Sequence, residues 1–141
     1  MTIVDVEREK LYARSEDVDD LAASTGSDVV RLLPGFDQYV LSPGTTDPRI
    51  IAPSRRAAVS RAGGWIAPVV VSGGVVAGTW ATADDRVEVS LFSEAGDVSR
   101  AALEREVQRL AAVSGTRRRL SVTTPRPGRR TVSKDPGGSG P

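Results

Sequence analysis

The chain has 141 residues, enough for one domain with a hydrophobic core, and its 19 basic and 18 acidic side chains give a net charge of +1. It contains neither cysteine nor histidine, which excludes disulfides, thiolate chemistry, histidine-based catalytic triads and the commonest zinc ligand. No apolar stretch approaches the roughly 20 residues of a membrane span and the N-terminus lacks the pattern of a signal peptide, so we expect a soluble cytoplasmic protein.

The charges are unevenly distributed along the chain. Residues 1–28 carry eight acidic and three basic side chains, a net charge of −5, whereas residues 29–116 carry nine of each sign. Residues 117–141 carry seven basic and one acidic side chain, a net charge of +6. The chain therefore combines an acidic beginning with a basic end, an asymmetry that a functional account has to address.

The acidic beginning predicts a hairpin followed by a helix. Residues 2–13 place short apolar and charged runs around a turn, as in a β-hairpin. We expect Ser15 to cap the helix and Gly26 to end it, with one apolar face around Val18 and Leu21. The acidic residues of the first turn suit the positive end of the helix dipole. We prefer this interpretation to a carboxylate metal site, for which no further ligand is present.

The next stretch predicts a strand, a loop and a short helix. Residues 29–41 form the first strongly apolar run and predict a strand region, interrupted by a turn or bulge at Pro34–Gly35. Residues 42–48 are a loop by composition. Residues 53–62 predict a helix with Pro53 at its first position and a glycine pair after its end. The arginines of this helix suit a phosphate-contacting patch and an ordinary solvated face equally well.

A second hairpin is predicted for residues 65–80, where two β-branched runs flank Gly73–Gly74, a dipeptide that accepts the positive φ angles of a tight turn. Trp65 and Trp80 delimit it, and we interpret both as core anchors, with a stacking or wedge role as the alternative. Residues 86–92 alternate strictly between polar and apolar side chains and predict a further strand.

A long helix is predicted for residues 99–114, because Ser99 is a suitable N-cap and Gly115 a suitable end. Its apolar stripe is spaced to pack on a sheet, and Glu104 and Glu106 are expected on its surface. Residues 116–141 are basic and rich in proline and glycine, so we expect disorder there. Such a tail binds nucleic acid weakly through charge alone, or serves only solubility.

The pattern as a whole predicts an α+β fold, a small antiparallel β-sheet with flanking helices. We find no phosphate-binding loop of the Gly-Lys-Ser/Thr kind and no Gly-x-Ser-x-Gly elbow, and the glycine pair at 73–74 joins strands without leading into a helix. The carboxylate pair Asp84–Asp85 falls on a turn and shows no sign of acid–base chemistry. No catalytic residue, metal ligand or cofactor site is predicted.

Three segments resemble one bacterial family. They are the run Arg31–Leu41, reading RLLPGFDQYVL, the hairpin Ile66–Trp80, which ends in GTW, and the strand around Val87–Val89 with the helix near 103–110. In order and spacing they are similar to the C-terminal part of the winged-helix DNA-binding-domain proteins, whose members include DNA glycosylases that unhook interstrand crosslinks. The resemblance covers roughly residues 1–115, and the tail matches no family pattern.

The resemblance implies a division into three parts. Residues 1–28 would be the remnant of a winged-helix wing and a connecting helix, residues 29–115 the C-terminal α+β domain, and residues 116–141 the disordered basic tail. Family members are longer and carry tandem winged-helix modules ahead of this region. The chain therefore resembles a truncated C-terminal portion whose Met1 lies within a wing.

The resemblance does not carry over a catalytic residue. The glycosylases of the family use a Gln-x-Gln or Gln-x-Asp pair near their N-terminus, and neither Gln38 nor Gln108 belongs to such a pair. Ala81 stands where the family often has a basic residue after the tryptophan, which weakens phosphate binding there. An enzyme built on this chain would need another group, such as the carboxylate of Asp37.

We therefore expect a non-catalytic protein that binds double-stranded DNA, without cofactor or metal. Its oligomeric state is left open. The alternative is a gene fragment, or a mispredicted start, of a longer winged-helix DNA glycosylase-like protein. The candidate DNA contacts are Arg49, Arg55, Arg56, Arg61, Arg117, Arg118 and Arg119.

Overall fold

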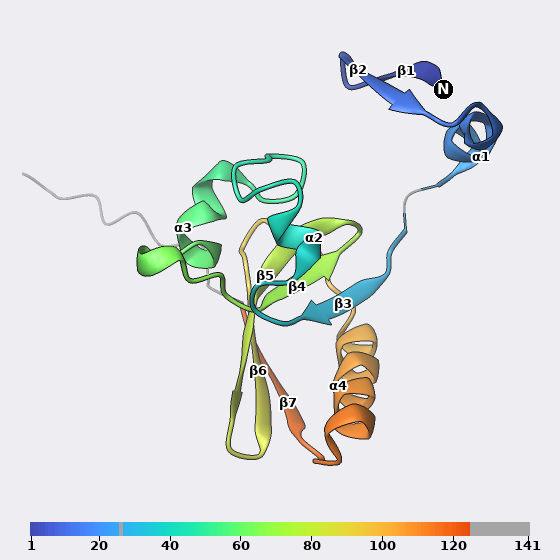
Figure 1. Ribbon diagram of the computed structural model, residues 1–141. Coiled ribbons are helices and arrows are strands. Elements are labelled where there is room, and N and C mark those ends of the chain that lie inside the picture. Colours follow the sequence, from blue (N-terminus) through green and yellow to red (C-terminus); the bar gives the residue numbers. More distant parts are fainter. Residues whose placement is uncertain (26, 125–141) are drawn as a thin grey trace, which may run out of the picture.

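A five-stranded sheet forms the centre of the molecule (Figure 1). The computed structural model describes residues 1–25 and 27–124, so the predicted helix end at Gly26 and residues 125–141 of the predicted tail lie outside the described residues. The strands pair in chain order: β3 (Val30–Leu33), β4 (Val69–Ser72), β5 (Val75–Ala83), β6 (Arg86–Leu91) and β7 (Arg119–Thr123). The pairs from β3 to β6 are antiparallel, whereas β7 runs parallel to β6. The α+β class is confirmed, but the sheet is mixed.

The helix α4 (Arg100–Ser114) covers one face of the sheet and connects β6 to β7 (Figure 1). Its ends are as predicted: the Ser99 side chain accepts a hydrogen bond from the Ala102 N–H, and Gly115 adopts a left-handed conformation at φ 71°. The core on this face comprises Val30, Leu32, Val70, Val87, Val89, Leu91, Leu103 and Val107. The apolar residues of the alternation predicted for β6 thus face α4.

The segment between β3 and β4 covers part of the opposite face of the sheet. Val69 and Val71, the neighbours of Val70 in β4, point to that face because successive side chains of a strand alternate between the two faces. It contains four short helical turns: α2 (Gln38–Leu41), η2 (Pro53–Arg55), α3 (Arg56–Val59) and η3 (Ala62–Gly64). A second core forms there from Val40, Ile51, Val59, Ile66, Val69, Val71, Val76 and Phe92. The sheet is therefore packed on both faces near β4.

The N-terminal residues form the predicted hairpin, β1 (Thr2–Val6) and β2 (Glu9–Ala13), followed by η1 (Ser15–Asp17) and α1 (Val18–Ala23). Ser15 does not cap the helix, because its hydroxyl pairs with Thr2 Oγ1 at 2.6 Å instead. The predicted apolar face of α1 is uncovered: Leu21 is 56% exposed. Residues 24–25 and 27–29, between this helix and the sheet, belong to neither a helix nor a strand.

Two predicted elements are shorter than expected. The strand region 29–41 ends at Leu33, since Asp37 Oδ1 accepts from the Tyr39 N–H at 2.9 Å and caps the helix α2. The helix predicted for 53–62 ends at Val59, because Ser60 forms a β-bridge to Ile66.

The prediction of disorder from Thr116 is wrong for β7. Leu120 and Val122 alternate with polar residues and pack against the core beneath α4, which outweighs the basic composition around them. The surface position predicted for Glu106 is also wrong. Its side chain is buried against β3, where its carboxylate accepts a hydrogen bond of 3.0 Å from the Leu32 N–H. This N–H lies on the outer edge of β3 and has no strand partner.

The two tryptophans differ in environment. Trp80 packs against the core as predicted, and its Nε1 donates to the Leu33 carbonyl at 2.8 Å. Trp65 is 52% exposed, so its prediction as a core anchor is wrong. The backbone turns outward at this point because Gly63 and Gly64, at φ 74° and 75°, place the chain on the surface just before it.

Candidate nucleic-acid interface

Four of the seven predicted DNA contacts, Arg49, Arg55, Arg56 and Arg61, lie on the segment that covers the second core. Pro53 begins η2, Val59 is fully buried, and the bridge between Ser60 and Ile66 then reverses the chain direction. The buried side chain of Val59 determines which side of this segment faces the core. The arginines of the segment therefore point toward solvent or toward neighbouring loops. Their partners decide which of them are available to a phosphate.

Arg55 is occupied by the protein itself. Its guanidinium pairs with both carboxylate oxygens of Glu94, and its Cζ lies 4.9 Å from the centre of the Phe92 ring. Hydrogen bonding from Arg55 lowers the pKa of Glu94 to about 2, and the same bond raises the pKa of Arg55. This arginine therefore ties the inserted segment to the loop after β6.

Arg49 is also paired. Its guanidinium donates to Asp47 at 2.8 Å and to Glu9 at 3.1 Å, which connects the N-terminal hairpin to the loop before η2. The hydrogen bond from Arg49 is the largest of the effects that lower the pKa of Asp47. Arg119 lies farther from a partner, with its Nε 3.8 Å from Asp85. These three arginines carry charges that nearby carboxylates partly compensate.

Arg56 and Arg61 have no carboxylate within 4.0 Å among the residues that the structure describes. Both side chains are exposed. Arg56 makes one long contact, 3.5 Å from its Nε to Thr45 Oγ1. Arg61 is anchored through its backbone, whose N–H donates to the Trp65 carbonyl at 2.8 Å. Their positive charges remain available at the surface.

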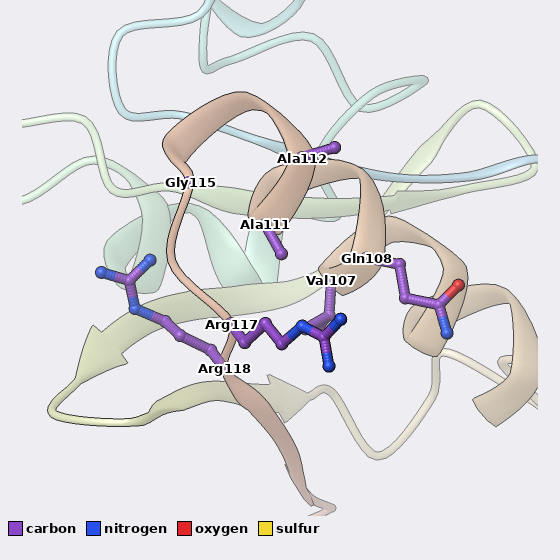
Figure 2. Close-up of a pocket in the computed structure, with 7 residues that line it drawn as sticks. All are labelled: Val107, Gln108, Ala111, Ala112, Gly115, Arg117 and Arg118. Atoms are coloured by element: carbon purple, nitrogen blue, oxygen red, sulfur yellow. The ribbon is translucent and has the colours of Figure 1, made fainter.

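Arg117 and Arg118 line a hollow of about 700 Å³ at the end of α4, together with Val107, Gln108, Ala111, Ala112 and Gly115 (Figure 2). Neither arginine pairs with a carboxylate in the described part of the chain. The two guanidinium groups extend to opposite sides of the chain in Figure 2, as expected for neighbours entering a strand. They therefore suit two points on an extended anion better than one small anion.

A cleft of about 580 Å³ lies beside Arg61 and was not predicted. Its lining comprises Pro34, Gly35, Arg61, Trp65, Ala67 and Pro68 of the segment between β3 and β4, and residues 79–82 of β5 with Glu88 and Ser90 of β6. The rings of Trp65 and Phe36 meet edge to face, 5.2 Å between centres and 87° between planes. The sequence signal was the placement of two aromatic residues directly after the glycines at 35 and 64.

Asp37 and the two glutamines lie at the helices α2 and α4. Asp37 caps α2, Gln38 begins that helix, and Gln108 lies on α4 at the hollow described above. Residues 1–25 and 27–124 contain no group of three or more side chains arranged to hold a metal ion. None of the helices within these ranges is long and apolar enough to cross a membrane.

Comparison with known proteins assigns a family. The sequence profile of the AlkZ-like family, described as DNA glycosylase AlkZ-like, matches residues 1–113. The interstrand DNA cross-link repair glycosylase of Streptomyces sahachiroi is 44% identical over 118 residues, which are 84% of this chain and 32% of that protein. The solved structure of the DNA glycosylase AlkZ from the same organism superposes with a TM-score of 0.81 at 42% identity, covering 86% of this chain and 33% of that one. The chain spans about a third of the length of the curated relative that it matches.

Proposed function

The chain belongs to the AlkZ-like DNA glycosylase family, and we propose that it acts as a DNA-binding module that holds duplex DNA without itself removing a base. The curated relative is named for glycosylase action in interstrand DNA cross-link repair, which makes DNA the partner we propose. The chain contains two glutamines, and neither belongs to a Gln-x-Gln or Gln-x-Asp pair. This supports the non-catalytic part of the proposal.

One observation carries the proposal: four of the seven candidate arginines are free of carboxylate partners among the described residues. These are Arg56, Arg61, Arg117 and Arg118. A cation that already pairs with a carboxylate neutralises a phosphate less effectively, whereas an unpaired exposed cation releases counterions from DNA on contact. We expect a smaller contribution to DNA binding from the three paired arginines, Arg49, Arg55 and Arg119.

The salt dependence of duplex binding tests the proposal. Each phosphate contact adds roughly 0.9 to the slope of log K against log salt concentration, so R56Q with R61Q should reduce the slope by about 1.8. The matched control is R14Q with R100Q, which removes the same charge from two arginines that pair with carboxylates. A wild-type slope near zero, or an equal loss in the control, would overturn the proposal.

The second candidate is that the chain is part of a longer family protein, with the hairpin at 2–13 as a winged-helix wing and residues 29–115 as a C-terminal domain. Uncovered apolar side chains favour it: Ile3 and Tyr12 on the hairpin are 57% and 72% exposed, and Leu21 is exposed on α1. In a longer protein, further modules would cover them. The mass of the protein isolated from its source cells distinguishes the two, because 14.9 kDa is expected for this chain alone.

A further inference from the structure

We propose that the cleft beside Trp65 binds one unpaired nucleobase of DNA, stacked on the indole, with the adjoining phosphate on Arg61. The inference rests on the proposed DNA-binding function and adds to it a site and a class of ligand. It follows from the exposure and orientation of the aromatic pair, from the charge of the cleft wall and from the size of the cleft.

The indole of Trp65 is available as a stacking surface. About half of it is exposed, and Phe36, 46% exposed, holds it by an edge-to-face contact. The carbonyl of Trp65 also accepts the hydrogen bond from Arg61 N–H, so the backbone on which the ring is carried is fixed. An indole held in one orientation loses little conformational entropy when a base stacks on it.

The turn that carries Phe36 is held in a sparsely populated conformation. Phe36 has φ 60°, a left-handed value that is unfavourable for a bulky side chain. The preceding Gly35 lies so close to the neighbouring segment that a Cβ there would be 2.8 Å from the Ile66 carbonyl oxygen. Strain of this kind persists where surrounding contacts enforce it and is concentrated at ligand sites. The enforced turn places the ring of Phe36 against Trp65, whose side chain lines the cleft.

The polar groups of the cleft match a nucleotide. Arg61 supplies a positive charge to the cleft, free of carboxylate partners in the described part of the chain. Strand β6 contributes the carboxylate of Glu88 and the hydroxyl of Ser90 to the same cleft. A carboxylate repels a phosphate but accepts hydrogen bonds from the amino group of a base, as it does from cytosine N4. The cation and the carboxylate therefore suit the two ends of one nucleotide.

An unpaired base fits this site better than paired DNA. In a duplex both faces of each base are already stacked on neighbouring bases, so an exposed indole finds no free face. A cleft of about 580 Å³ is within the range of pockets that enclose small ligands, roughly 300–1,000 Å³. An unpaired base offers its face to Trp65 and its phosphate to Arg61 at once.

The fluorescence of Trp65 provides a direct test. Trp65 and Trp80 are the two tryptophans of the full chain, and W65F retains Trp80 alone, so an emission change that the wild type shows and W65F lacks reports on Trp65. We expect oligothymidylate of about 10 nucleotides, within the usual site sizes for single-strand binding, to quench its emission, and a blunt duplex of the same length to leave it unchanged. W65A should weaken single-strand binding about 5- to 150-fold, with duplex binding kept within about twofold. W65F should retain most of the affinity.

Three results separate the inference from the proposed function. Single-strand binding without any change in Trp65 emission would overturn the inference, as would an equal loss of single-strand and duplex affinity in W65A. Duplex binding with no single-strand binding would overturn the inference and leave the proposed function standing. Absence of binding to either DNA would overturn the proposed function itself. The emission measurement keeps the indole in place, so it remains decisive even if W65A does not fold.

Discussion

Replacing Glu106 by alanine should destabilise the fold more than any other single change to a charged side chain of α4. Glu106 is 5% exposed, and its Oε2 accepts from the Leu32 N–H at 3.0 Å and from Arg109 Nη2 at 2.9 Å. Arg31 Nη1 lies 3.6 Å from the other oxygen. β3 is an edge strand, so the Leu32 N–H has no strand partner, and this carboxylate satisfies it.

The magnitude follows from these contacts. A buried N–H left without an acceptor costs about 1–3 kcal/mol. The pair with Arg109, whose side chain is half exposed, adds at most about 0.5 kcal/mol. We therefore expect E106A to lower the free energy of unfolding by about 1–3.5 kcal/mol. E106Q should lose about 1 kcal/mol, because its amide oxygen still accepts from Leu32.

Urea unfolding followed by tryptophan fluorescence measures the effect. The matched control is E104A on the same helix, since Glu104 is exposed and pairs only with Arg100 among the described residues, and it should change stability by less than about 0.5 kcal/mol. If E106A and E104A shift the urea midpoint equally, the assignment of Glu106 as the acceptor for the edge strand is wrong.

Three further predictions concern pH, close packing and the cleft. The pKa of Glu94 is lowered to about 2, so its pair with Arg55 stabilises the fold fully above the unfolded pKa near 4.5, and this stabilisation is lost as the pH falls toward 2. Between these pH values the free energy of unfolding should therefore fall less steeply in R55Q than in the wild type, as measured by unfolding at a series of acid pH values. Gly78→Ala should cost more than about 3 kcal/mol by thermal unfolding, because its Cβ would meet the backbone at Ser90. Glu88→Ala should abolish any preference for oligodeoxycytidylate over oligothymidylate in the emission assay, because it removes the acceptor for the cytosine amino group.

Local signals predicted the elements that local interactions determine. The alternation of Val87 and Val89, the cap at Ser99 and the left-handed Gly115 are each set by residues a few positions apart, and all were confirmed. β7 escaped prediction because its pairing with β6 depends on a helical connection between the strands, whereas its own apolar content is two side chains within a basic stretch. Composition averaged over the tail concealed them.

The environments of Glu106 and Trp65 were less predictable, because they depend on the tertiary structure around each residue. Glu106 is buried on account of an N–H that lies 74 residues away in the sequence. Trp65 has the composition of a core residue, and only the outward turn at the two preceding glycines exposes it. The hydrophobic periodicity of a short sequence window indicates neither the burial of Glu106 nor the exposure of Trp65. The cleft therefore became visible only with the tertiary structure.

The arginines show the same limit in electrostatic terms. In the sequence Arg55 and Arg56 are equivalent cations at adjacent positions. In the fold Glu94, 39 residues from Arg55, forms a bidentate pair with Arg55, whereas Arg56 is exposed. Pairing lowers the charge that a phosphate experiences, while the neighbouring unpaired cation keeps it. The part of the arginine cluster that suits DNA is therefore selected by the carboxylates of the fold, and Arg61, which stays unpaired among the described residues, lines the same cleft as the exposed Trp65.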